Sequence, residues 1–456
     1  MTPPPRRAHI GCGAGFSGDR TDAPISVVRH LKDLPAPRFL ILETLGERTL
    51  ADAQKARLAD PQAGFEPLLG ELLTPVLADC LAHKIRIVSN CGAANPLGAA
   101  RFIKGLAAEL GLPAPKIGVV LGDDLTGKLG AFALTPWEGE RADLVIDETA
   151  VVAANAYLGA DAIRAALDEG ADIVVAGRVS DPALAVGPLT HVFGWGGDAP
   201  DRIAAGILAG HLLECGSQIT GGYFADPGMK DVPGMDDIGY PIAEVTDEGV
   251  ITVFKAPGTG GAVTSRTVKE QLLYEIHDPA AYITPDGILD LTEVEVEETG
   301  PDRVRVTGAR GRPATDTYKV TVSLRGGWLG EGEISYAGPN AEARARLTGE
   351  TLRKRLARRG LDVRARIDLI GVESIFDSDD GALARSRIGT AQDVRVRLAV
   401  EADEKATVEA ATQEVLALLC SGPAGGGGAR RRHVARIHTV SCLVAKAAID
   451  VRVEWI

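Results

Sequence analysis

Polar and charged side chains follow several short apolar runs in the first half of the chain, at the points where the runs end. The candidate catalytic residues chosen from these positions are Asp19, Glu47, Asn90, Asp123, Arg178 and Asp181. A carboxylate can remove a proton next to a carbonyl group, and an arginine or amide donor can stabilise the oxygen that becomes negative. Ligands of parallel sheets bind outside the carboxyl ends of the strands, so we expect the six side chains to surround one cleft.

Each of these residues also has a structural interpretation. Asp181 and Pro182 form the pattern of a helix N-cap followed by proline at the first helical position. Arg178 could pair with a neighbouring carboxylate, and Glu47 could lie on a solvated helix face. The residue types alone leave both interpretations open.

Asp123 and Asp124 stand side by side after an apolar run. Adjacent carboxylates at a strand end can hold a hard cation such as Mg²⁺, and they are equally common as turn and cap residues. A divalent cation held by this pair is the candidate cofactor.

Two glycine-rich stretches are candidates for substrate binding. Residues 11–20 (GCGAGFSGDR) allow close approach of the backbone to a ligand, and residues 255–264 (KAPGTGGAVT) could form an amide nest for a phosphate or carboxylate. Neither has the spacing of a nucleotide-binding fingerprint. The expected binding residues are Gly13, Gly15, Arg20, Asn95, Lys255, Gly258, Gly260, Gly261 and Thr264.

A third group lies near the end of an expected helix that begins at about Asp201. His211, Glu214 and Cys215 share one face of that helix, because they are three and four residues apart. Such a face could bind a metal, do acid–base work or supply a nucleophile, and it could equally be structural.

The elements that must position these residues alternate along the chain. Apolar runs at 7–10, 39–42, 85–88, 116–121 and 172–176 predict strands, a further run at 144–146 predicts another, and helical patterns lie between them. This order predicts an α/β domain with a mainly parallel sheet over residues 8–230. A Pro-, Gly- and Asp-rich stretch at 226–239 predicts a boundary, and period-two strands with two helices predict a smaller α+β domain over 240–456.

Composition narrows the function classes. The net charge of −13 argues against a nucleic-acid or membrane partner, and the six cysteines lack metal-site spacing. The polar N-terminus and the lack of a long apolar run favour a cytoplasmic protein. A chain of 456 residues is typical of soluble enzymes that form homo-oligomers.

Seven motifs, in order, carry a family resemblance: GAGFSGDR, SNCGAANP, VVLGDDL, NAYLGAD, GRVSDPAL, GHLLECGSQITGGYF and GTGG followed by TVKEQLLYEI. From Ala8 to its end the sequence resembles the acyclic terpene utilisation (AtuA-like) family. The resemblance implies a role in bacterial breakdown of acyclic terpenes and related branched acids through acyl-CoA intermediates, with CoA as part of the substrate. Many members carry an added C-terminal ferredoxin-like domain beyond the point where this sequence ends, which implies a small ferredoxin-like subunit as a candidate partner.

Three functions follow as alternatives. The first is a lyase or hydratase on an isoprenoid-derived acyl-CoA or carboxylic acid, with Asp123 or Glu47 as the base. The second is a non-catalytic acyl-CoA-binding subunit of a heteromeric enzyme. The third is a hydrolase or transferase that uses Cys215 with His211.

Overall fold

The computed structural model describes residues 5–137 and 146–456. The chain forms two compact units. The first contains the described residues up to Ser323 together with Thr439–Ile456, and the second contains Leu324–His438.

A ten-stranded sheet forms the centre of the first unit, with the strand order β12-β13-β9-β8-β1-β2-β3-β7-β4-β19. Its five middle strands are parallel, and they are the five predicted from the apolar runs at 7–10 to 172–176. Their bounds are β1 Arg7–Ala14, β2 Arg38–Leu42, β3 Ile85–Ser89, β7 Ile173–Ala176 and β4 Ile117–Leu121. The predicted α/β class is therefore confirmed.

The outer strands make this sheet mixed rather than mainly parallel. They are antiparallel to their neighbours: β8 Pro241–Thr246, β9 Ile251–Lys255, β13 Arg303–Thr307, β12 Glu295–Gly300 and β19 Arg452–Trp455. The boundary expected at 226–239 lies inside the first unit, because β8 continues the sheet by pairing with β1. A Pro- and Gly-rich stretch marks an irregular connection, and it does not show that the strands on its two sides belong to different sheets.

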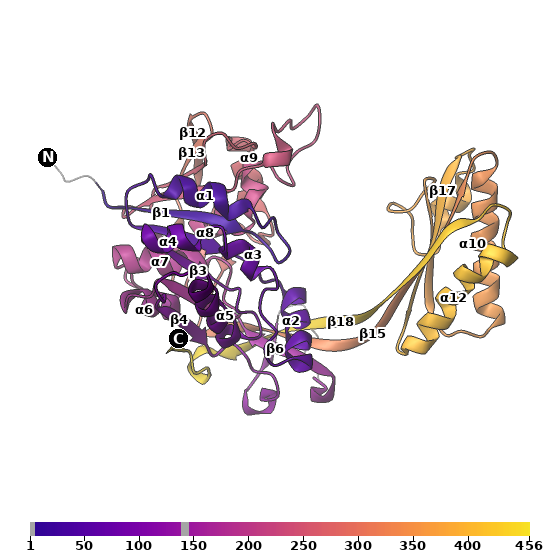
Figure 1. Ribbon diagram of the computed structural model, residues 1–456, viewed down its shortest axis with the longest axis horizontal. Coiled ribbons are helices and arrows are strands. Elements are labelled where there is room, and N and C mark those ends of the chain that lie inside the picture. Colours follow the sequence, from indigo (N-terminus) through magenta and orange to yellow (C-terminus); the bar gives the residue numbers. More distant parts are fainter. Residues whose placement is uncertain (1–4, 138–145) are drawn as a thin grey trace. The chain divides into compact units, whose positions relative to one another are not determined.

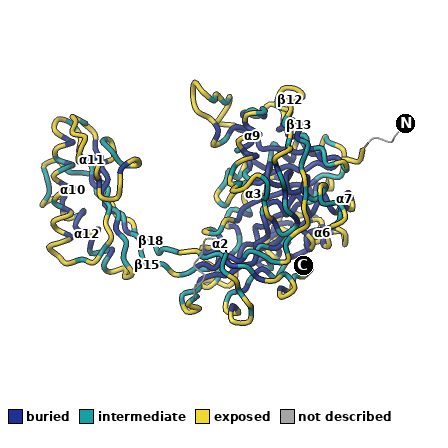
Figure 2. Tube along the Cα trace, turned by 180° about the vertical axis from the view of Figure 1, so that it is seen from behind, coloured by how far each residue is buried: buried dark blue, intermediate teal, exposed yellow. Residues whose placement is uncertain are grey.

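Helices pack on this sheet (Figure 1). Their bounds are α1 Ala23–Leu31, α3 Leu69–Leu73, α4 Leu77–Ala82, α5 Pro96–Glu109, α6 Asp161–Asp168, α7 Ala183–Phe193, α8 Pro200–Glu214 and α9 Ser265–Leu273, whereas α2 Glu47–Ala59 packs against the short strand β6. The core is made of β-branched and leucine side chains from the strands and from the inner faces of the helices. Figure 2 shows buried residues along the inner strands and exposed residues in the outer loops.

Shorter strands complete the first unit. A three-stranded sheet contains β10 Tyr282–Ile283, β11 Ile288–Asp290 and β14 Arg310–Arg312. Strand β6 (Val151–Ala156) pairs with β15 (Thr317–Ala337), and β5 (Thr135–Pro136) pairs with β18 (Gly427–Ala445). Most of the strand expected at 144–146 lies outside the described residues.

The second unit has the element order strand, helix, strand, strand, helix, strand. These elements are β15 Thr317–Ala337, α10 Ala341–Arg358, β16 Arg364–Ile370, β17 Asp393–Ala402, α12 Lys405–Ser421 and β18 Gly427–Ala445, with the short helix α11 (Ala382–Ser386) before β17. The strand order β16-β17-β15-β18 is that of a ferredoxin-like fold. A ferredoxin-like unit thus lies within the chain, where the sequence predicted only undivided α+β structure.

The second unit has its own core. Val394, Val396 and Leu398 alternate with exposed or half-buried residues along β17, and they pack with residues of α10 and α12. The four consecutive glycines at 425–428 lie at and just before the start of β18, which also contains the arginines at 430–432. Among the described residues, no helix is long and apolar enough to cross a membrane.

Candidate active site

A cavity of about 460 Å³ lies where β1, β2 and β7 end, beside the C-terminus of α8. The three strands are parallel members of one sheet, so the residues that follow them meet at the same edge. Of the described residues that line the cavity, five bear a carboxyl group: Asp19, Glu43, Asp181, Glu214 and Glu275. We call it the acidic cavity.

Glu43 follows β2 directly and is 7% exposed. The side-chain amide of Asn90 donates a 2.6 Å hydrogen bond to Glu43 Oε1, and the backbone N–H of Leu45 donates another of 3.0 Å to the same atom. Burial raises the pKa of Glu43 well above its usual value, and the negative charge of Asp181 raises it further. Arg178 and the Asn90 hydrogen bond oppose this shift only in part. Glu43 is therefore a carboxyl group that can hold and release a proton near neutral pH.

Asp181 takes its position from Arg178, which is 2% exposed. The guanidinium donates hydrogen bonds to Asp181 Oδ1 and to the backbone carbonyls of Leu45 and Val179. It also lies 4.6 Å from the centre of the Tyr157 ring. The N-cap expected at Asp181 is not formed by its side chain, because the carboxylate binds Arg178 instead. Arg178 is thus a positioning residue, and it is not among the residues that line the acidic cavity.

Glu214 forms a buried pair with His211, whose Nδ1 lies 3.0 Å from Glu214 Oε1. The other ring nitrogen lies 3.3 Å from the carbonyl oxygen of Leu272, and because a carbonyl can only accept, Nε2 carries a hydrogen. The Nδ1–Oε1 contact then holds one further proton, on either the ring or the carboxyl group. Burial raises the pKa of Glu214, and the neighbouring His211 lowers it in part.

Glu214 Oε2 is buried and has no hydrogen-bond partner among the described residues. A buried polar atom without a partner is rare and calls for a water or ligand group. Glu214 is also one of the residues that line the acidic cavity.

Asp19 shapes the turn after β1. Its Oδ2 accepts a 2.7 Å hydrogen bond from the backbone N–H of Gly15, and its Oδ1 accepts from the hydroxyl of Tyr240. Gly15 is needed here, because a Cβ at this position would lie 2.5 Å from the backbone of Cys215 at the end of α8. This close approach brings the carboxyl end of β1 against the helix that carries Glu214.

The rim of the acidic cavity has two unusual features. Phe16 and Tyr223 are aromatic side chains that are 58% and 87% exposed. Tyr223 and Glu275 both have left-handed backbone conformations, with φ of 59° and 58°. Such conformations are uncommon for residues other than glycine, because they cost free energy that the rest of the fold must offset. Where they occur, they cluster at functional sites.

The structure brings some of the sequence-predicted catalytic residues together and separates others. Asp19 and Asp181 line the acidic cavity. Asn90 lies behind it and holds Glu43 and the backbone N–H of Thr44. Asp123 accepts a 2.8 Å hydrogen bond from the backbone N–H of Arg178.

Glu47 lies outside the acidic cavity. It starts α2 and accepts hydrogen bonds of 2.9–3.0 Å from Lys319, Tyr157 and Thr321. Burial alone would raise its pKa, but Lys319 and these hydrogen bonds lower it below the usual value. Glu47 therefore fastens α2 to the strands beside it.

Asp123 and Asp124 do not form a shared cation site. Asp123 Oδ2 accepts from Arg178 and from the Asn155 amide, whereas Asp124 accepts from the Thr126 backbone and lies 3.5 Å from Arg57. Burial raises the pKa of Asp123 to about 6. Across residues 5–137 and 146–456, no group of three or more His, Cys, Asp or Glu side chains could hold a metal ion.

Several residues expected to bind substrate have structural contacts instead. Asn95 caps α5 by accepting from the backbone N–H of Gly98, and Thr264 caps α9 by accepting from that of Thr267. Gly13 packs against Leu42, where a Cβ would lie 2.8 Å from a side-chain carbon.

The stretch 255–264 does not form the expected amide nest. The N–H groups of Gly260 and Gly261 donate to the carbonyls of Asp237 and Pro233. Lys255 Nζ donates to the carbonyl of Thr259 and lies 3.2 Å from Asp302. These donors are occupied within the fold and do not converge on a ligand.

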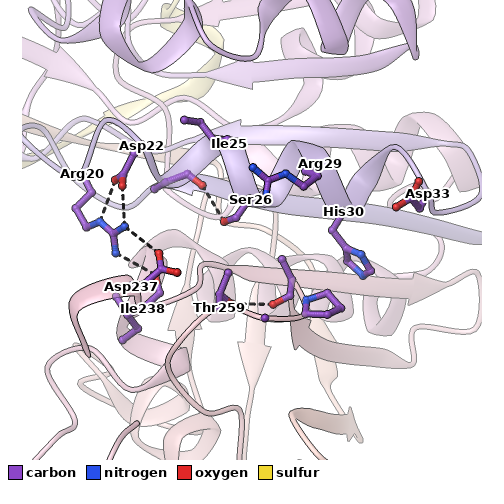
Figure 3. A pocket seen from close by; sticks show the side chains of 14 residues that line it. Arg20, Asp22, Ile25, Ser26, Arg29, His30, Asp33, Asp237, Ile238 and Thr259 are labelled. Atoms are coloured by element: carbon purple, nitrogen blue, oxygen red, sulfur yellow. Dashed lines mark hydrogen bonds and ion pairs between the residues drawn. The ribbon is translucent and has the colours of Figure 1, made fainter. Parts of the chain in front are cut away.

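Arg20 and Gly258 line a separate cavity of about 470 Å³ (Figure 3). Figure 3 shows Arg20 between two carboxylates, with hydrogen bonds to Asp22 and an ion pair to Asp237. The Arg20 charge is thus already balanced by neighbouring carboxylates.

Glu43 and Glu214 are not among the six residues predicted to be catalytic. Glu43 carries the same signal as the selected residues, since it is the first residue after an apolar run. Glu214 was visible only as part of a His–Glu–Cys helix face, and nothing in the sequence showed that this face meets the ends of β1 and β2. Cys215 has a thiol whose pKa is raised by burial and by Glu214, and both ring nitrogens of His211 contact other groups, so the geometry does not favour a Cys–His nucleophile.

A family model described as "Acyclic terpene utilisation family protein AtuA" matches residues 8–455. The chain belongs to this family. The match covers both structural units of the AtuA family member, including the whole ferredoxin-like unit. Searches of curated proteins and of solved structures each gave no match.

Proposed function

We propose that this AtuA family member is a lyase or hydratase that acts on an isoprenoid-derived acyl-CoA or carboxylic acid. The observation that carries the proposal is Glu43, a buried carboxyl group of raised pKa at the strand ends, facing a cavity it shares with Asp181 and Glu214. Elimination and addition of water beside a carbonyl group both need a group that takes a proton and one that returns it.

Glu43 and Glu214 divide these roles. Glu43 removes or returns the proton on the carbon next to the carbonyl group. Glu214 shares a proton with His211 and has a free oxygen for a substrate hydroxyl group or leaving water. Asp181 keeps Glu43 basic enough to accept a proton, because its charge disfavours a second nearby carboxylate.

The charge of the cavity favours a thioester over a free acid. A substrate carboxylate would add another negative charge among five carboxyl-bearing residues, whereas the carbonyl of a thioester is neutral. We therefore expect acyl-CoA esters to be the better substrates.

The test is an assay of the wild-type protein with branched acyl-CoA esters and the matching acids, each with and without Mg²⁺. Gain or loss of water is followed by mass spectrometry. Turnover of an ester that falls about 100-fold or more in Glu43→Gln supports the proposal. No turnover of any ester or acid contradicts it and favours the alternative of an acyl-CoA-binding subunit without catalysis.

A further inference from the structure

A second cavity, of about 440 Å³, lies in the first unit, and Asp181 lines both it and the acidic cavity. Its apolar and aromatic lining residues are Trp137, Tyr157, Pro182, Tyr282, Ile283, Pro285 and Leu443. We call it the apolar cavity. Neither the sequence motifs nor the proposed proton transfer gives it a role.

The walls of the apolar cavity are fixed by contacts made away from it. The Tyr157 ring lies between the Arg178 guanidinium at 4.6 Å and Lys319 Nζ at 4.9 Å. The Tyr157 hydroxyl and Lys319 Nζ each donate a hydrogen bond to Glu47. The Thr284 hydroxyl donates one to the carbonyl of Gly287. Because these polar atoms have partners, the lining presents mainly ring faces and aliphatic groups.

Two further links join the cavities. The Tyr282 ring lines the apolar cavity and lies 5.4 Å from the ring of His211, the partner of Glu214. Ser180, next to Asp181, lines the apolar cavity, is 6% exposed, and its Oγ has no hydrogen-bond partner among the described residues. A buried hydroxyl without a partner beside an apolar space points to a ligand that brings one oxygen to it.

We propose that the apolar cavity binds the aliphatic chain of the substrate, with the chain passing Asp181 and the carbonyl end lying in the acidic cavity. Ser180 Oγ–H donates a hydrogen bond to the substrate oxygen nearest this junction. The ligand class is an acyl thioester with an extended or branched hydrocarbon chain. This inference rests on the proposed function for the position of the reacting end.

Binding of a chain-length series tests the inference without requiring turnover. The full-length Glu43→Gln variant is titrated calorimetrically with acetyl-, butanoyl-, hexanoyl-, octanoyl- and 3-methylbutanoyl-CoA. We expect affinity to rise about fourfold for each added CH₂ until the cavity is filled, because each buried methylene gains transfer free energy. Equal affinity across the series overturns the inference.

Substitutions in two different cavities test which of them causes the increase in affinity with chain length. Leu443→Trp, made in the same background, should abolish the increase for the longer chains and leave acetyl-CoA binding unchanged. Ile25→Trp, which adds the same bulk to the cavity of Figure 3, should keep the increase. If affinity still increases with chain length in Leu443→Trp, the inference is overturned. If Leu443→Trp loses its native circular dichroism spectrum, Thr317→Leu, which narrows the same cavity, replaces it, and the same increase in affinity is measured.

Ser180→Ala provides a second readout. It should weaken binding about three- to tenfold at every chain length, while thermal stability is kept or raised because an unpartnered hydroxyl is removed. Unchanged affinity contradicts the role of Ser180. If affinity increases with acyl chain length but the wild type turns over no substrate, only the proposed function is contradicted. If the wild type turns over substrate but affinity does not change with chain length, only the apolar subsite is contradicted.

Discussion

At the residue scale, Glu43 and Asn90 have different roles at the strand ends. Asn90 was expected to stabilise a substrate oxygen, but both ends of its amide are bonded within the fold. Its partner Glu43 faces the cavity, with a pKa raised by burial and by Asp181. The sequence showed that polar residues follow the strands, but it could not show which of them line the acidic cavity, because that depends on side-chain partners from distant segments.

Asp123 gives a pH-dependent stability that can be measured. Its pKa is raised by burial to about 6, from 3.8, so the unfolded chain releases this proton at a lower pH than the folded protein. This contribution to stability is therefore largest below pH 3.8 and is lost as the pH rises to 6. We expect the free energy of unfolding of the wild type, relative to Asp123→Asn, to fall by on the order of 3 kcal/mol over this range. Urea denaturation at a series of pH values measures it, and a difference that does not change with pH contradicts this account of Asp123.

At the scale of elements, the acidic cavity is formed by the ends of β1, β2 and β7 and by the C-terminus of α8. Four of the five parallel strands, β2, β3, β4 and β7, were predictable because each is a short run of mainly buried aliphatic residues. Strand β8 was not predicted, and its antiparallel pairing with β1 depends on register rather than on local pattern. The approach of α8 to the end of β1 was also invisible, since it depends on Gly15 lying against a backbone 200 residues away.

The variant Gly15→Ala tests the close contact between the end of β1 and the end of α8. The new Cβ would lie 2.5 Å from the backbone carbon of Cys215 and from the N–H of Gly216, so β1 and α8 must separate. We expect a loss of about 1–3 kcal/mol in the free energy of unfolding and a weaker affinity for acyl-CoA. Gly105→Ala is the control, because its Cβ in α5 would have no atom of the described chain within 4 Å, so this variant should have equal or higher stability. Equal melting temperatures for Gly15→Ala and the wild type would refute the close contact.

At the scale of the whole molecule, the candidate site and both cavities lie in the first unit, and the second unit has a core of its own. We expect residues 324–438, expressed alone, to fold cooperatively as a ferredoxin-like unit. Thermal unfolding followed by circular dichroism checks this. A non-cooperative melt would show that the unit needs the rest of the chain.

Association remains a prediction from the sequence. We expect a homo-oligomer, with a small ferredoxin-like subunit as a further candidate partner, and hence a mass above 47.7 kDa in light scattering. A monomer that turns over substrate unaided would contradict both forms of association.

The central claim is that Glu43 exchanges a proton with the substrate. The most direct measurement is deuterium incorporation from D₂O at the carbon next to the carbonyl group of a branched acyl-CoA, followed by NMR. The base is the ionised form, so the rate should rise with pH, with a midpoint above the ordinary glutamate value of 4.5. We predict that Glu43→Gln slows the exchange by about 100-fold or more, whereas Glu109→Gln, in which the same change is made at the exposed end of α5, retains it. Exchange at the wild-type rate in Glu43→Gln would contradict the account.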